Sequence, residues 1–91
     1  MKPIVSIITI NFNGLHDTCA MIESLKQHET YPYEVIVVDN GSKQDEASII
    51  AERYPTVKVV RNENTGFAGG NNVGLRLAEG EYIFFLNTDT E

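Results

Sequence analysis

The stretch EYIFFLNTDTE, residues 81–91, decides the predicted fold. Its first half is an apolar and aromatic run, which is typical of a strand buried on both faces of a parallel sheet. The run stops at Asn87, and Asp89 follows shortly after it. Ligands of open α/β sheets bind outside the carboxyl ends of strands, so this carboxylate is a candidate ligand for a hard cation. The alternative is that Asp89 only caps a turn, because Asn, Thr and Asp are ordinary turn residues.

Other β-branched runs precede this stretch, and segments with helical periodicity separate them. The predicted strands cover residues 4–10, 34–38, 57–60 and 82–86, and helices are expected from about Asp17, after Ser42, and over residues 67–78. Helices that alternate with buried strands predict a parallel sheet with right-handed crossovers. We therefore expect an α/β fold, a Rossmann-like three-layer sandwich of about four strands, with residues 1–91 in one domain.

The first two helices each carry an apolar stripe. The expected buried positions are Leu15, Cys19, Ile22 and Leu25 in the first helix, and Ala47, Ile50, Ala51 and Tyr54 in the second. Ser42, followed three residues later by Asp45, predicts a weak capping box for the second helix.

Composition limits the function classes. The formal net charge is 7 − 13 = −6, and an acidic chain is a poor candidate for a nucleic-acid partner. A single cysteine, Cys19, rules out an internal disulfide and suits a reducing compartment. No signal peptide is visible, and no run reaches the roughly 20 apolar residues of a membrane-spanning helix. We expect a cytoplasmic protein, either free or peripheral at the inner face of the membrane.

Polar clusters follow three of the predicted strands. They are Asn11 with Asn13, residues 39–42, and residues 87–89. Each is ordinary turn chemistry alone, but the carboxyl ends of parallel strands meet at one edge of a sheet. Asp39 can accept hydrogen bonds from a base or ribose, and Asp89 could hold a cation that bridges a diphosphate. The common placement predicts a nucleotide site.

The glycine-rich segment 64–74 adds a fourth cluster at the start of the third predicted helix. Free backbone N–H groups at a helix start favour phosphate oxygens. Glycine inside a helix costs about 1 kcal/mol per position, so something must approach this backbone closely. A ligand and a neighbouring strand are both possible reasons.

Competing nucleotide-binding classes lack their signatures. A dinucleotide-binding dehydrogenase typically carries the motif G-x-G-x-x-G after its first strand, and a P-loop enzyme carries G-x-x-x-x-G-K-[ST]. Neither motif is present in this sequence. A nucleotidyltransferase would show a glycine-rich loop with basic residues after the first strand, where this chain has Asn-Phe-Asn-Gly. A non-catalytic Rossmann-like nucleotide-binding or interaction module remains the alternative, with Asp39 and Asp89 as turn caps.

Four segments in order resemble the N-terminal half of family 2 inverting glycosyltransferases, most closely the rhamnosyltransferase type. They are VSIITINFN (5–13), VVDNGS (37–42), NTGFAGGNNVG (64–74) and LNTDT (86–90), and the resemblance covers essentially the whole chain. It implies a GT-A fold. It also implies transfer of a sugar from a UDP- or dTDP-sugar, with inversion, to a saccharide or lipid-linked acceptor in cell-surface polysaccharide synthesis.

The resemblance also assigns residues. It implies nucleotide binding by Thr9, Asn11, Asn13, Asp39, Asn40, Gly66, Gly69 and Asn72. Asp39 would accept the hydrogen bond from N3 of uracil or thymine. Asp89, with Asn87, matches the family's D-x-D position and would hold Mg²⁺ or Mn²⁺. Asn87 in place of an aspartate leaves one fewer charge for the cation.

In the resembled family the general base lies beyond the D-x-D position. We therefore expect it beyond Glu91, with no catalytic residue in this chain, so that the isolated 91 residues bind donor without turnover. The strand over residues 82–86 is expected to form an exposed sheet edge, through which the chain could self-associate.

Overall fold

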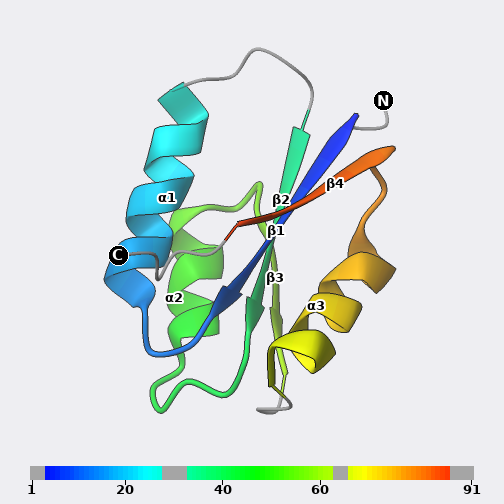
Figure 1. Cartoon of the computed structure of the whole chain (residues 1–91). Coiled ribbons are helices and arrows are strands. Elements are labelled where there is room, and N and C mark those ends of the chain that lie inside the picture. Colours follow the sequence, from blue (N-terminus) through cyan, green and yellow to red (C-terminus); the bar gives the residue numbers. More distant parts are fainter. Residues whose placement is uncertain (1–3, 28–32, 63–65, 87–91) are drawn as a thin grey trace.

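The computed structural model describes residues 4–27, 33–62 and 66–86 (Figure 1). Its elements are β1 (Val5–Asn11), α1 (Leu15–Gln27), β2 (Tyr33–Asp39), α2 (Glu46–Arg53), β3 (Lys58–Arg61), α3 (Gly66–Leu77) and β4 (Tyr82–Leu86). This alternation confirms the predicted α/β fold. None of the helices in the described part of the chain is long and apolar enough to cross a membrane.

The strands form one parallel sheet in the order β3-β2-β1-β4. β1 and β2 are therefore interior strands, and β3 and β4 are the edges. The register places Asn11 opposite Asp39, and Asp39 opposite Arg61. Polar residues from three strands thus meet at the carboxyl edge of the sheet.

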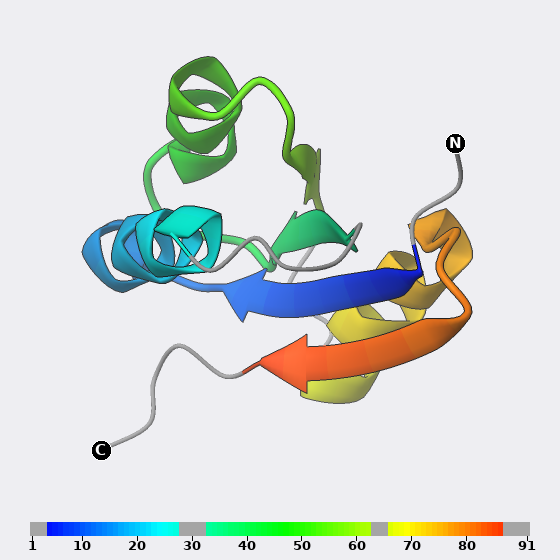
Figure 2. The same cartoon turned by 90° about the horizontal axis from the view of Figure 1, so that it is seen from above.

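The sheet is the middle layer of three. Figure 2 shows α1 and α2 on one side of the sheet and α3 on the other. Because side chains alternate along a strand, the odd positions Val35 and Val37 pack with Cys19, Ile22, Ile50 and Tyr54. The even positions Ile36 and Val38 pack instead with Ile8 of β1 and with Val73 of α3. The predicted stripe of α1 is confirmed.

Two glycines allow α3 to lie against β1. Gly70 and Gly74 are four residues apart and share one helix face. A Cβ atom at Gly74 would lie 2.5 Å from Ile8 Cγ2, and one at Gly70 would lie 2.8 Å from Ile10 Cδ1. A neighbouring strand is therefore the reason for these two glycines.

The predicted burial of the fourth strand on both faces is wrong. Tyr82, Phe84, Phe85 and Leu86 are between 38% and 61% exposed, and only Ile83 packs into the core on the α3 side. The strand itself is confirmed. It is exposed because it lies at the sheet edge, where α3 packs mainly over β1 and β2 and no described helix covers the opposite face.

Two predictions for α2 are also wrong. Ser42 does not cap the helix: the N-cap is Asp45, whose carboxylate accepts from Ser48 N–H at 3.3 Å. This carboxylate also accepts from the Ser48 hydroxyl, and the two bonds hold the pKa of Asp45 below its usual range. Ala51 is exposed, whereas Ala47, Ile50 and Tyr54 are buried as predicted.

Candidate functional site

The carboxylate of Asp39 is the centre of the polar cluster at the carboxyl edge. Asp39 ends β2 and is fully buried. Its Oδ1 accepts from Asn11 Nδ2 at 2.8 Å and from the Ser42 hydroxyl at 2.5 Å. Its Oδ2 accepts from Ser42 N–H at 3.3 Å and from Arg61 Nη1 at 3.5 Å. Both oxygens therefore have partners, as a buried charge requires.

Asn11 connects this carboxylate to both helices on the α1/α2 face. Its Nδ2 also donates to Glu46 Oε1 at 2.8 Å, and its Oδ1 accepts from the Thr18 hydroxyl at 2.6 Å. Because an ionised carboxylate only accepts, the two acids fix which way the Asn11 amide points. Asn11 thus joins the end of β1 to α1, β2 and α2.

The loops after β1 and β2 are held together by further hydrogen bonds. Asn13, which is exposed, has φ 52, and its N–H donates to the Ser42 hydroxyl at 2.8 Å. Its Oδ1 accepts from Lys43 N–H at 2.9 Å. Gly41 has φ 90, a left-handed conformation that glycine adopts without strain. These hydrogen bonds and the two left-handed residues therefore fix the backbone shape of the two loops.

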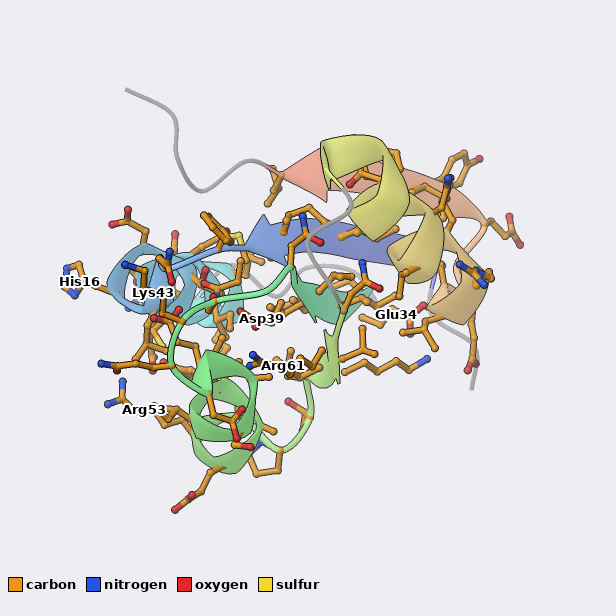
Figure 3. The ribbon with its side chains drawn as sticks, turned by 90° about the horizontal axis from the view of Figure 1, so that it is seen from below. His16, Glu34, Asp39, Lys43, Arg53 and Arg61 are labelled. Atoms are coloured by element: carbon orange, nitrogen blue, oxygen red, sulfur yellow. The ribbon has the colours of Figure 1, made fainter. Side chains whose placement is uncertain are left out.

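Arg61, which ends β3, is a member of this cluster that the sequence interpretation missed. Its guanidinium donates to Ser42 O at 3.2 Å, and Nη1 lies 3.9 Å from Asp45 Oδ1. Its side chain is 49% exposed. Figure 3 looks at the end towards which β1 and β2 run and shows Arg61 beside Asp39. An arginine directly after a predicted strand was the available signal, because parallel strands end at one edge.

Thr9 and Asn40 also lie near the carboxyl end of the sheet but are largely buried. Thr9 is 1% exposed, and its hydroxyl donates to Leu86 O of β4 at 2.7 Å. Asn40 is 5% exposed, and its Oδ1 accepts from Asn62 Nδ2 at 3.3 Å. Thr9, Asn11, Asn13, Asp39 and Asn40 therefore lie towards the same end of the sheet.

The remaining predicted residues belong to α3 or lie outside the described residues. Gly66 begins α3, Gly69 is half-buried, and Asn72 is exposed with its carbonyl accepting from Arg76 Nε at 3.5 Å. The start of α3 lies near Asn40, since a Cβ at Gly70 would be 3.8 Å from Asn40 Cγ. Asn87 and Asp89 lie outside the described residues. Within residues 4–27, 33–62 and 66–86, no three His, Cys, Asp or Glu side chains form a metal-type group.

A second polar cluster surrounds Glu34 near the start of β2. Glu34 Oε2 accepts from the Ser6 hydroxyl at 2.5 Å and from Glu79 N–H at 2.6 Å, and Oε1 lies 2.7 Å from Lys58 Nζ. The Ser6 hydroxyl in turn accepts from Gly80 N–H at 2.8 Å. This cluster holds the α3–β4 turn at the amino end of the sheet, away from the candidate site.

These contacts perturb the titration of Glu34. Burial acts to raise its pKa, but hydrogen bonds from Glu79 N–H, Lys58 and Ser6 outweigh it and hold the pKa below the ordinary 4.5. The pKa of Lys58 is raised, chiefly by its hydrogen bond to Glu34. The folded chain therefore favours the charged form of both groups.

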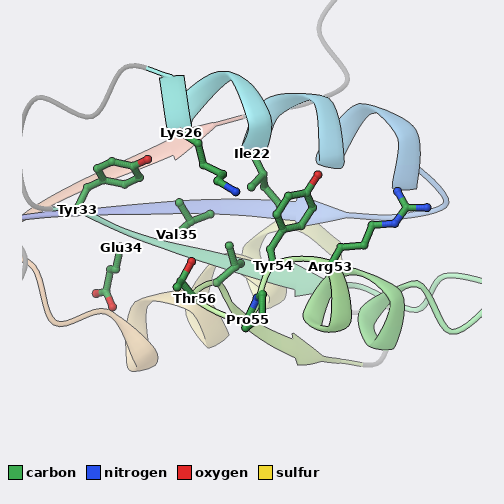
Figure 4. A pocket seen from close by; sticks show the side chains of 10 residues that line it. Ile22, Lys26, Tyr33, Glu34, Val35, Arg53, Tyr54, Pro55 and Thr56 are labelled. Atoms are coloured by element: carbon green, nitrogen blue, oxygen red, sulfur yellow. The ribbon is translucent and has the colours of Figure 1, made fainter.

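A cavity of about 370 Å³ lies on the α1/α2 face near the start of β2 (Figure 4). Lys26 reaches across it, with Nζ 5.5 Å from the centre of the Tyr54 ring. Burial and a hydrogen bond to Glu23 raise the pKa of Tyr54 to about 12, so this phenol stays protonated at neutral pH. The cavity is remote from the Asp39 cluster, and we assign the candidate site by its chemistry and its place on the sheet.

The chain is similar to known proteins over nearly its whole length. Residues 6–91 match the model of glycosyl transferase family 2, and the chain is a member of that family. It is 39% identical over 87 residues to an uncharacterized glycosyltransferase of Haemophilus influenzae, covering 93% of this chain and 29% of the relative. It is also 39% identical over 92 residues to a hyaluronan synthase of Pasteurella multocida, covering 93% of this chain and 9% of the synthase. The chain thus spans less than a third of either relative.

Solved structures agree with the GT-A fold. The chain superposes on S. aureus TarS 1-349 with a TM-score of 0.80 at 31% identity, covering 98% of this chain and 28% of that one. It superposes on the mannosyltransferase PcManGT of Pyrobaculum calidifontis, described in complex with GDP-Man and Mn²⁺, with a TM-score of 0.79 at 26% identity. That match covers 98% of this chain and 28% of PcManGT. The narrower rhamnosyltransferase likeness stays a prediction.

Proposed function

We propose that the carboxyl edge of β1 and β2 is the donor site of an inverting glycosyltransferase. The donor is a UDP- or dTDP-sugar, and the acceptor is a saccharide or lipid-linked sugar in cell-surface polysaccharide synthesis. One observation carries the proposal: in a family 2 chain, Asn11, Asp39 and Arg61 meet in register where parallel strands end.

In this proposal Asp39 recognises the base. Its Oδ2 has only the longer contacts, at 3.3 and 3.5 Å, so it is the oxygen with capacity for an N3–H donor. Asn11 and Ser42 hold Oδ1 and fix the orientation of the carboxylate. Asn13 and Asn40 border the same edge. The start of α3, with Gly66, Gly69 and Asn72, would flank the diphosphate and sugar.

The proposal includes a divalent cation. Asp89, with Asn87, would hold Mg²⁺ or Mn²⁺, which would neutralise the diphosphate as the glycosidic bond breaks. The Mn²⁺ described for PcManGT supports this assignment by likeness. We place the general base outside these 91 residues, so the chain alone binds donor and transfers no sugar.

A second candidate function has an observation in its favour. Every oxygen of the Asp39 carboxylate is already hydrogen-bonded within the chain. A nucleotide-binding or interaction module without catalysis would use Asp39 as a framework residue and would show no metal-dependent nucleotide binding.

Calorimetric titration separates these functions. UDP and dTDP are titrated into the 91-residue chain with and without Mn²⁺, and the titrations are repeated with Asp39→Ala after its fold has been checked by circular dichroism. The donor site predicts metal-dependent binding that a folded Asp39→Ala variant loses. Nucleotide binding that is equal with and without metal, and unchanged in Asp39→Ala, contradicts it.

Self-association through β4 is a further part of the proposal. β4 is an edge strand in the described sheet, and Tyr82, Phe84 and Phe85 are each at least half exposed. Sedimentation equilibrium should show reversible dimers whose population rises with concentration. A strictly monomeric chain at high concentration contradicts this.

We also propose that the protein is located in the cytoplasm, either freely or peripherally at the inner face of the membrane. A single free cysteine suits this reducing compartment.

A further inference from the structure

The two oxygens of Asp39 are held by different kinds of partner. Oδ1 receives short bonds of 2.5 and 2.8 Å from the side chains of Ser42 and Asn11. Oδ2 receives longer contacts, at 3.3 Å from Ser42 N–H and at 3.5 Å from Arg61 Nη1. In a charge-assisted N–H bond to a carboxylate, the nitrogen and the oxygen are roughly 2.7–2.9 Å apart. Oδ2 is therefore the oxygen that a stronger incoming donor would take.

Arg61 is the partner of Asp39 that solvent reaches. The side chain of Arg61 is 49% exposed, whereas Asn11 is 1% and Ser42 is 2% exposed. Asn11 and Ser42 cannot leave the carboxylate without opening the junction between the β1 and β2 loops. A group that approaches Oδ2 from solvent meets Arg61 first.

The contacts of Arg61 are long, and its side chain is partly exposed. Its contacts with Asp39, Ser42 O and Asp45 are 3.5, 3.2 and 3.9 Å long. Arg61 is about half exposed, and its pair with the exposed Asp45 contributes at most about 1 kcal/mol; its contact with the buried Asp39 carboxylate is longer than a normal charge-assisted bond. The side chain can therefore leave Oδ2 when an incoming donor takes its place, because the buried carboxylate then keeps its partners.

The charges of the cluster give Arg61 a second possible partner. Asp39, Asp45 and Glu46 place three carboxylates at this edge, on a chain of net charge −6. A nucleoside diphosphate brings more negative charge to the same place, and it needs a cation there. A guanidinium matches phosphate oxygens with two parallel N–H bonds, a geometry that an ammonium lacks.

We propose that Arg61 changes partner when a nucleoside diphosphate binds. In the free chain Arg61 covers and neutralises Oδ2 of Asp39. In the complex it leaves Oδ2 to the base and pairs with the diphosphate. Arg61 is then a binding residue that favours diphosphates over nucleosides, and this role rests on the nucleotide site proposed above.

The test compares diphosphates with nucleosides. UDP, dTDP, uridine and thymidine are titrated at one Mn²⁺ concentration into the wild-type chain, Arg61→Ala, Arg61→Lys and the control Arg53→Ala. Arg53 is exposed at the end of α2 that is far from Asp39, and Arg53→Ala removes the same charge as Arg61→Ala. Arg61→Ala should weaken diphosphate binding about tenfold, the effect of one charge-assisted pair. Nucleoside binding should stay equal or tighten, because Oδ2 is uncovered. Arg61→Lys should restore part of the diphosphate affinity, and Arg53→Ala should leave the ratio unchanged.

Each other outcome overturns a stated part of the proposal. Equal ratios in Arg61→Ala and Arg53→Ala remove the role of Arg61 and leave the nucleotide site intact. Equal weakening of diphosphates and nucleosides shows that Arg61 only supports the fold of the site, which also overturns the partner change. If the wild-type chain binds none of the four ligands, the donor site itself is wrong and this inference falls with it. Should Arg61→Ala fail to fold by circular dichroism, the ratio in Arg61→Lys decides, since an unchanged ratio there contradicts the bidentate contact.

Discussion

Glu34 and Asp39, near the two ends of β2, sit in clusters built from the same parts. Each carboxylate accepts a 2.5 Å hydrogen bond from a buried serine hydroxyl, Ser6 or Ser42. Each also faces a partly exposed cation from β3, which for Glu34 is Lys58 and for Asp39 is the arginine at the other end of the strand. Residue types alone would give both clusters the same role.

The difference lies in what else each carboxylate binds and where it stands. Glu34 accepts from a backbone N–H of Glu79, and so it fastens the turn between α3 and β4 at the amino end of the sheet. Asp39 accepts from Asn11 and orders two loops at the carboxyl end, where α/β folds bind ligands. A buried carboxylate whose oxygens all have hydrogen-bond partners therefore does not by itself indicate a ligand-binding site. Its position at the carboxyl end of the sheet is the feature that does so.

Removing the two carboxylates should give the largest effects. Asp39→Ala should lower the free energy of unfolding by about 3 kcal/mol or more, because the amide of Asn11 and the hydroxyl of Ser42 lose a buried acceptor. Glu34→Ala should cost about 2 kcal/mol, because Lys58 is 38% exposed and regains water. Urea denaturation measures both values. A larger loss for Glu34→Ala would contradict the ranking of the two clusters.

The serine hydroxyls allow a finer version of the same comparison. Ser42→Ala and Ser6→Ala should each cost about 1–2 kcal/mol, because the N–H groups of Asn13 and Gly80 lose their acceptor. The two variants should differ in nucleotide affinity: Ser42→Ala lowers it, and Ser6→Ala leaves it unchanged. Parallel urea and UDP titrations test this, and a loss of affinity in Ser6→Ala would break the distinction between the clusters.

The smallest effect is the pH dependence that Glu34 contributes to the stability of the chain. Its pKa in the folded chain lies below the ordinary 4.5, so the unfolded chain binds the proton more readily. The stabilisation is therefore present above pH 4.5 and is lost as the pH falls through the folded pKa. In Glu34→Gln the loss of stability below pH 4.5 should be shallower than in the wild type. Identical slopes in chemical denaturation at several pH values would contradict the assignment.

Much of this fold could be predicted from the pattern of apolar runs and breaks. Val35, Val37, Ile36 and Val38 form a continuous apolar run, which correctly predicted a strand, and the structure covers both of its faces. The run of β4 looks the same in sequence but is exposed, because its place at the sheet edge depends on strand order. Strand order is a tertiary property that the local pattern does not contain.

The candidate site was predicted in part. Asn11 and Asp39 were recognised because each follows a strand, yet the structure shows both as buried and internally bonded. Arg61 was missed although it directly follows a predicted strand, which is the same signal that identified Asn11 and Asp39. The Glu34 cluster was missed as well, although Ser6 inside an apolar strand was a signal: a buried hydroxyl needs a partner.

The most direct test is a paired titration of the two near-isosteric variants, Asp39→Asn and Glu34→Gln, with UDP and dTDP in the presence of Mn²⁺. Both variants remove one charge from β2, and circular dichroism is used to check that each is folded before it is titrated. The donor site at the carboxyl edge predicts that Asp39→Asn weakens nucleotide binding at least about tenfold, because an amide at Oδ2 cannot serve as the same charged acceptor. Glu34→Gln should bind as the wild type does. Equal affinities in the two variants, or a greater loss in Glu34→Gln, would contradict the assignment of the site to Asp39.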